Sequence, residues 1–252
     1  MDNNANNERW LEAARQTLEL DKRSPKQLEV SIRDSGRFKA VYPIARHALT
    51  QVSAALLLHD RGHSFAALAN GRVAFEHALI AQWIVLTEGS EAVVGNTINR
   101  SHSLVLKELE PHAAVIPSEL RSLLDLPKAK LLPPFQSICN RFDRTGLLYT
   151  VYRGLTGSVH VSGATIAEHV SVDTKTEQLT LHPHPRSSVP PTDFEMTLGW
   201  SAVLAKTALE ILLLDGTDLL RVAEIAHTTG LPHDLTNDDQ HPERQPAQYH
   251  QN

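Results

Sequence analysis

Apolar residues recur at spacings of three and four along most of the chain, a pattern typical of amphipathic α-helices that share a core. Between residues 37 and 59 they form one helical stripe, made of Phe38, Val41, Ala45, Ala48, Leu49, Val52 and Leu56. A second long helix is predicted over 63–86, after Asp60-Arg61-Gly62, where the glycine suits a helix C-terminus. Because the link between these two helices is short, we expect an antiparallel helical hairpin.

The remaining periodic segments predict more helices and one exception. The further helices are expected over 91–110, 117–126, 135–160, 193–214 and 218–226. Between residues 169 and 181, apolar positions instead alternate with period two on either side of a polar stretch, which indicates a β-hairpin. The chain is therefore predicted to be mostly all-α, a multi-helix bundle with a small inserted β-hairpin near 169–181.

The same pattern suggests how the chain is organised. With 252 residues, 41% of them hydrophobic, it is long enough to bury one large core. We expect that core in a helical-bundle domain over 37–227, preceded by an N-terminal helical appendage over 1–36. Residues 228–252 are polar, contain three prolines and lack apolar periodicity, so we expect a disordered C-terminal tail.

The composition narrows the classes of protein. The formal net charge is −5, so bulk charge would not hold the chain to nucleic acid or to an anionic membrane, although a local basic pocket remains compatible with it. A single cysteine, Cys139, excludes an internal disulfide framework and a zinc site built on several thiolates. Neither a secretory signal nor a membrane-spanning apolar run is visible, so we expect a soluble cytoplasmic protein without a membrane partner.

Charged residues interrupt the apolar stripe of the helix predicted over 63–86. Arg72 and Glu76 fall on that stripe, and their spacing of four residues lets them pair. Burying two charges costs several kcal/mol per ion unless they are paired and hydrogen-bonded. Two interpretations remain open: a structural ion pair that sets helix register, or a polar pocket inside the bundle.

The helix predicted over 135–160 has a similar feature. Its apolar face continues by steps of three and four onto Arg153 and His160, seven residues apart. We therefore expect Arg72, Glu76, Arg153 and His160 to form one polar cluster, with Tyr149 or Tyr152 close by. Two arginines facing one glutamate would leave a positive cavity suited to phosphate or carboxylate.

These two segments carry a resemblance. Arg72 with Phe75-Glu76, followed later by Tyr152-Arg153 and Val159-His160, resembles a bacterial family of helical proteins known only as a domain of unknown function. The resemblance covers roughly residues 37–214, with Thr156 where that family often has serine. It implies a helical fold and a polar pocket, and it implies no reaction.

A second resemblance implies chemistry. HEPN-type ribonucleases are helical bundles that dimerise and cut RNA without metal, using an arginine and a histidine four to six residues further along one helix. Arg72-x4-His77 and Arg153-x6-His160 are similar to that pattern, although Val73 and Gly154 stand where the family often has a polar residue. By this resemblance His160 would act as general base or acid, and Arg153 would stabilise charge on the phosphate.

Fourteen histidines raise the question of a metal site. Glu224 and His227 match half of a di-iron ligand set, but no second Glu-x-x-His occurs. His59 and His63 flank a predicted helix break, and there is no HExxH motif. The chain also lacks a Gly-rich phosphate loop, a nucleophile elbow and a dinucleotide fingerprint. We therefore expect neither a metal nor another cofactor.

Two classes of function remain open. In the first, the protein is a metal-independent endoribonuclease or toxin-like effector of bacterial defence. Its catalytic residues would be Arg153, His160, Arg72 and Glu76, and its ligand-binding residues Tyr149, Tyr152 and His77. In the second, it is a non-catalytic binding or scaffold protein whose polar cluster is structural or holds a small anion. The expected partners are RNA or a small anionic ligand, together with a second copy of the chain, since helical bundles often dimerise.

Overall fold

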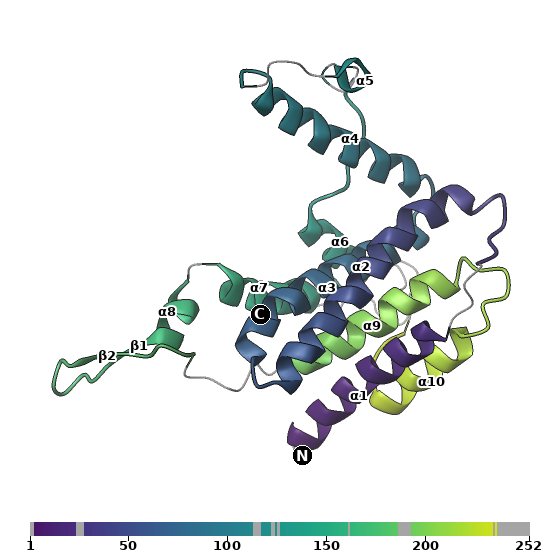
Figure 1. Cartoon of the computed structure of the whole chain (residues 1–252). Coiled ribbons are helices and arrows are strands. Elements are labelled where there is room, and N and C mark those ends of the chain that lie inside the picture. The colour runs from purple at the N-terminus through teal and green to yellow at the C-terminus, as the bar shows by residue number, and fades with distance from the viewer. Residues whose placement is uncertain are drawn as a thin grey trace, which may run out of the picture.

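The structure is a computed structural model, which describes residues 3–23, 28–112, 117–121, 124, 127–160, 162–185, 193–233 and 235. The described chain is mostly helical, with one two-stranded antiparallel hairpin, which confirms the predicted fold class (Figure 1). In chain order the elements are α1 (Asn3–Lys22), α2 (Ser35–Asp60), α3 (Ser64–Val85), α4 (Ser90–Leu109), α5 (Ser118–Arg121), α6 (Phe135–Phe142), α7 (Leu147–Val159), α8 (Gly163–His169), β1 (Val170–Val172), β2 (Leu179–Leu181), α9 (Phe194–Glu210) and α10 (Leu219–Thr229).

The centre of the bundle consists of the predicted α2–α3 hairpin and helix α9, which packs against both (Figure 1). Each residue from Ser201 to Glu210 is buried, so α9 is enclosed on all sides over that length. Close approach of α3 to α9 depends on Gly71, where a Cβ atom would lie 2.9 Å from Cε2 of Phe194. A larger side chain at this position would push the two helices apart.

Helix α1 differs from the expected appendage, because it is an integral part of the core. Leu11 and Ala14 belong to the main core, and Ala13 and Leu20 pack with residues of α9 and α10 in a second cluster. The carbonyl oxygen of Trp10 lies where a Cβ atom on Gly199 would come within 2.5 Å of it. The amphipathic pattern of α1 is weak, but α9 provides an apolar face against which it packs.

The chain is still folded beyond residue 228, where the disordered C-terminal tail was expected to begin. Helix α10 continues to Thr229 and ends at Gly230, which has a φ of 70°. Leu231 and Leu235 are both buried, so the packed chain extends past the expected boundary. Residues 236–252 lie outside the described residues.

The prediction of one helix over 135–160 is wrong, because the chain forms α6 and α7 with a break between them. The Asp143 carboxylate accepts hydrogen bonds from the backbone N–H groups of Thr145, at 2.9 Å, and Leu148, at 3.0 Å. Gly146 then adopts a φ of 79° before α7 begins. Burial raises the pKa of Asp143, but the hydrogen bonds from Thr145, Leu148 and Leu147 outweigh it and lower that pKa overall. A side chain that bonds to backbone N–H groups competes with helix continuation.

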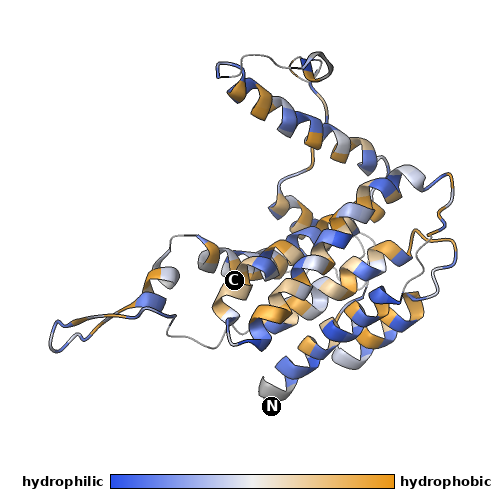
Figure 2. Ribbon diagram, in the orientation of Figure 1, coloured by the Kyte–Doolittle hydropathy of each residue, from blue (hydrophilic) through white to orange (hydrophobic). Residues whose placement is uncertain are grey.

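Two regions project from the bundle (Figure 1). On one side, α4 and α5 extend away from it, and Figure 2 shows hydrophobic residues on α4 beside hydrophilic ones. On the other, α8 leads into the hairpin, where Val170 pairs with Leu181 and Val172 with Leu179. The hairpin over 169–181 is thus confirmed, whereas α8 was not predicted. Of the helix expected over 117–126, the structure describes α5, and residues 122–123 and 125–126 lie outside the description.

Candidate functional site

A polar cluster joins α3 to α7 and contains four residues, which we call the Arg72 cluster: Arg72, Glu76, Tyr152 and Thr156. The Arg72 guanidinium donates from Nε to Oγ1 of Thr156, at 3.0 Å, and from Nη2 to the hydroxyl of Tyr152, at 2.5 Å. It also lies 3.6 Å from a carboxylate oxygen of Glu76. One arginine therefore reaches every other member of the cluster.

Helix geometry sets this arrangement, because each helix contributes two residues four apart, which lie on one face. The Tyr152 hydroxyl donates to Oε2 of Glu76 at 3.2 Å, and the Thr156 hydroxyl donates to the carbonyl of Tyr152 at 2.8 Å. The guanidinium also lies over the Tyr152 ring, 4.8 Å from its centroid. The hydrogen bonds therefore link the four residues to one another, from Arg72 through Tyr152 to Glu76 and from Arg72 to Thr156.

The cluster is half-buried and balanced in charge. The side chains of Arg72 and Glu76 are 20% and 29% exposed, and their charges cancel. Burial, and after it the negative charge of Glu76, raises the pKa of Tyr152, although Arg72 opposes this effect. The phenol is therefore a neutral hydrogen-bond donor at physiological pH.

The structure places Arg153 and His160 outside this cluster, contrary to expectation. Both are exposed, and the structure gives neither side chain a hydrogen bond or ion pair with a described residue. Arg153 follows Tyr152 directly, so the helical turn of about 100° per residue directs it away from α3. His160 caps α7 with an extended backbone, so the helical periodicity stops before it. Without the second arginine, the expected positive cavity does not form at the Arg72 cluster.

Tyr149 lies close to the cluster, as expected, through a line of aromatic rings. Its ring stacks near that of Tyr152, with centroids 6.0 Å apart, and Phe135 contacts the Tyr152 ring at 4.4 Å. These contacts pack the Tyr152 ring against two further aromatic rings. Tyr149 and Phe135 therefore position the phenol and take no part in its hydrogen bonds.

His77 joins a different group, because five residues along a helix turn it well away from Arg72. Its Nδ1 lies 2.7 Å from Nδ1 of His47 on α2, and the ring centroids are 4.7 Å apart. Burial, and then the nearby His47, lowers the pKa of His77 from 6.5 to about 4. The spacing Arg72-x4-His77 therefore does not bring these two side chains into one site.

The proton in the histidine pair can be assigned from its neighbours. Asn70 donates from Nδ2 to Oε1 of Gln51 at 2.7 Å, which directs the amide nitrogen of Gln51 toward Nε2 of His47 at 2.9 Å. Because Nε2 of His47 must then accept this hydrogen bond, the proton of neutral His47 is on Nδ1. That Nδ1 donates to Nδ1 of His77. A second proton between the two rings would leave two donors facing each other.

A second ionic group, centred on Lys206, was not predicted from the sequence. Its ammonium lies 2.7 Å from Glu210, 3.3 Å from Asp218 and 4.0 Å from Asp21, and Asp21 also pairs with Arg46. The side chains of Lys206 and Glu210 are only 2% and 3% exposed. This Lys206 network links α9 to α1, α2 and the start of α10. The sequence does contain an indication of this network, since Lys206 and Glu210 are four residues apart in an apolar helix.

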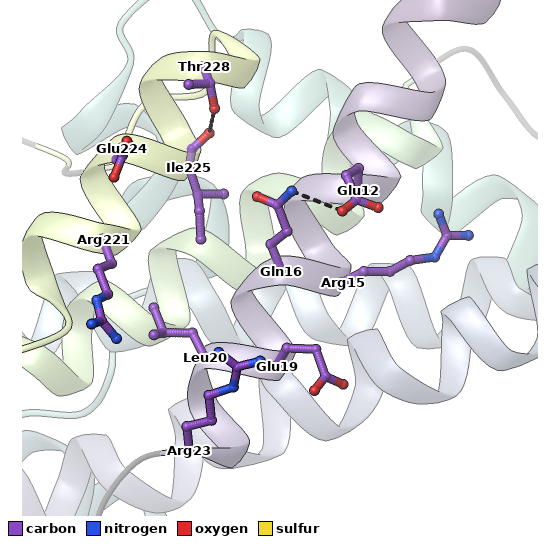
Figure 3. Close-up of a pocket in the computed structure, with 10 residues that line it drawn as sticks. All are labelled: Glu12, Arg15, Gln16, Glu19, Leu20, Arg23, Arg221, Glu224, Ile225 and Thr228. Atoms are coloured by element: carbon purple, nitrogen blue, oxygen red, sulfur yellow. Dashed lines mark hydrogen bonds between the residues drawn. The ribbon is translucent and has the colours of Figure 1, made fainter.

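The groove between α1 and α10 has a volume of about 740 Å³ and is lined by charges of both signs (Figure 3). Its arginines are matched by glutamates, and Arg15 pairs with Asp60 at 2.7 Å. The groove therefore carries no excess of one sign of charge among the arginines and glutamates that line it. Within the described residues, no group of three or more histidine, cysteine, aspartate or glutamate side chains could hold a metal ion.

Burial raises the pKa of Cys139 to about 12, with a smaller contribution from Asp143, so this thiol is not a nucleophile near neutral pH. None of the described helices is both long and apolar enough to span a membrane.

Comparison of the chain with protein-family models, with curated proteins and with solved structures finds no match.

Proposed function

We propose that this protein is a non-catalytic binding or scaffold protein, in which the Arg72 cluster is a structural connection between α3 and α7. One observation carries the proposal: Arg72 donates hydrogen bonds to Tyr152 and Thr156 and forms an ion pair with Glu76. A guanidinium that stabilises a reacting phosphate must have donors directed at the substrate. Here the donors with partners are directed at the neighbouring helix.

The charge balance supports the same proposal. General acid–base catalysis works best with a group whose pKa lies near the working pH, and in the cluster burial and Glu76 raise the pKa of the Tyr152 phenol. Glu76 accepts from Tyr152 and lies against Arg72, so its carboxylate is already engaged within the cluster. Tyr152 and Glu76 therefore act as a hydrogen-bonded contact between α3 and α7.

Replacing Tyr152 tests the structural role. We expect Tyr152→Phe to lower the free energy of unfolding by about 1–2 kcal/mol, because it removes a hydroxyl that both accepts and donates in a half-buried site. Tyr149→Phe is the matched control, since Tyr149 lies on the same helix and the structure gives its hydroxyl no hydrogen bond to a described residue. Equal effects of the two substitutions in chemical denaturation would contradict the structural role.

A ribonuclease is the second candidate, and the exposure of Arg153 and His160 favours it. They are seven residues apart at the end of α7, and both are accessible to a large substrate. The test is cleavage of RNA by the purified protein in EDTA, with Arg153→Ala and His160→Ala. The exposed Arg61→Ala and His63→Ala serve as controls. Cleavage that is lost in the first two variants and retained in the controls would overturn the non-catalytic proposal.

A further inference from the structure

The projecting helix α4 and the segment that follows α5 line an open pocket of about 510 Å³. Figure 1 shows this segment passing α4 on its way to α6. Four polar side chains line the pocket, three from α4 and one from the segment: Asn96, Asn99, Arg100 and Lys128. Pro127 and Leu131 form an apolar wall. The volume is within the range of small-molecule sites, roughly 300–1,000 Å³.

Among the described residues, the charges that line this pocket are all positive, in contrast to those of the α1–α10 groove. The described lining contains no aspartate or glutamate, and the structure pairs neither Arg100 nor Lys128 with a described carboxylate. Two unpaired cations on one small cavity repel each other, and a bound anion relieves that repulsion. The planar guanidinium forms two parallel bonds with phosphate oxygens, and the lysine ammonium adds a point charge.

Hydrogen bonds hold the segment against α4 and leave groups available to a ligand. Asn96 donates from Nδ2 to the carbonyl of Lys130 at 3.2 Å, and the hydroxyl of Thr97 accepts from the backbone N–H of Leu132 at 2.7 Å. The Oδ1 atom of Asn96 and the amide of Asn99 have no such partner among the described residues.

We propose that this pocket binds a phosphate monoester of a small hydroxyl-bearing organic molecule. The two cations match a group with a charge of about −1.5 to −2 near pH 7. The free carboxamide atoms accept from and donate to hydroxyl groups on the body of the ligand, and Pro127 and Leu131 cover its apolar part. The inference rests on the proposed binding function and names its ligand class.

Calorimetric titration of the full chain tests the proposal, with inorganic phosphate, glucose 6-phosphate and adenosine 5′-monophosphate as probes and glucose and adenosine as unphosphorylated controls. We expect at least one monoester to bind more tightly than inorganic phosphate and than its own unphosphorylated control. Arg100→Gln and Lys128→Gln should each weaken that binding about tenfold or more, because each removes a charge-assisted hydrogen bond. Lys107→Gln is the matched control, an exposed lysine on the same helix that does not line the pocket.

Any of four results would overturn the assignment. The first is no binding by any of the three phosphates at millimolar concentration, and the second is equal binding of the monoesters and their unphosphorylated controls. The third is an equal loss of binding in Lys107→Gln, and the fourth is tighter binding of a short single-stranded RNA that also depends on Arg100 and Lys128. The last result would assign the pocket to nucleic acid. These outcomes are separate from the RNA-cleavage assay, in which the pocket variants should behave as the wild type does. A failed pocket with no RNA cleavage leaves the non-catalytic proposal standing, whereas RNA cleavage overturns that proposal whatever the pocket binds.

Discussion

The Arg72 cluster and the Lys206 network start from the same local pattern, a cation followed four residues later by a glutamate on an apolar helix. They end in different environments. Arg72 and Glu76 remain 20% and 29% exposed and complete their bonds with neutral hydroxyl groups. Lys206 and Glu210 are almost fully buried and are joined by further carboxylates. The comparison shows that local spacing makes an ion pair, while the surroundings set the penalty for breaking it.

The largest expected effect is at Lys206. Lys206→Ala should lower the free energy of unfolding by about 3–5 kcal/mol, because Glu210 and Asp218 are then left close together without their common cation. Lys39→Ala, at an exposed position of α2, is the control in urea denaturation. The double variant Lys206→Met/Glu210→Met removes both charges and should recover part of the loss. A loss below about 1 kcal/mol for Lys206→Ala would show that the network is not a buried ionic joint.

Arg72→Met should have a smaller effect, about 2 kcal/mol, in the same measurement. The substitution leaves Glu76 without its cation and the Tyr152 hydroxyl without the donor from Arg72, but both groups can still reach water because the site is half-buried. A double-mutant cycle with Tyr152→Phe should give a coupling energy of about 1 kcal/mol. If Arg72→Met destabilised as strongly as Lys206→Ala, exposure would not explain the difference between the two groups.

The His47–His77 pair tests, through the pH dependence of stability, whether the surroundings set the cost of a buried charge. The pKa of His77 is lowered to about 4 in the folded protein, so below pH 6.5 the unfolded chain binds the proton more readily. Stability should therefore be complete above pH 6.5 and fall as the pH drops from 6.5 to 4, by about 1–2 kcal/mol after allowance for partial exposure. Thermal unfolding across this range should lose that slope in His77→Gln and keep it in the control, exposed His63→Gln.

The smallest effect isolates one hydrogen bond of the Arg72 cluster. Thr156 and Thr150 lie on α7, and each hydroxyl donates to a backbone carbonyl four residues earlier, but only Thr156 also accepts from Arg72. Thr156→Val should therefore destabilise by about 0.5–1 kcal/mol more than Thr150→Val in chemical denaturation. Indistinguishable values for the two variants would mean that the bond from Arg72 Nε makes no net contribution.

Helix α1 and the break between α6 and α7 show where prediction from sequence stops. Helix α1 has a weak amphipathic pattern, and its burial depends on the surface that α9 presents at Gly199. The break follows from Asp143, whose carboxylate takes the N–H groups that a continuous helix would use. The apolar periodicity continues across it and conceals it. Single polar residues can override a periodic pattern because backbone hydrogen bonds are individually strong.

The sequence by itself determined most of the helices and the pairing of Arg72 with Glu76, because these depend on neighbours within about four residues. It also determined the hairpin, whose two short strands alternate with period two on either side of a polar turn. The tertiary structure decided the partners that are distant along the chain. It directed Tyr152 and Thr156 to Arg72, left Arg153 and His160 exposed, and joined His77 to His47. It also surrounded Lys206 with carboxylates from α1, α9 and the residue that precedes α10. Helical periodicity defines a face to within about 100°, and only the packing of whole helices selects which residue on that face meets a partner.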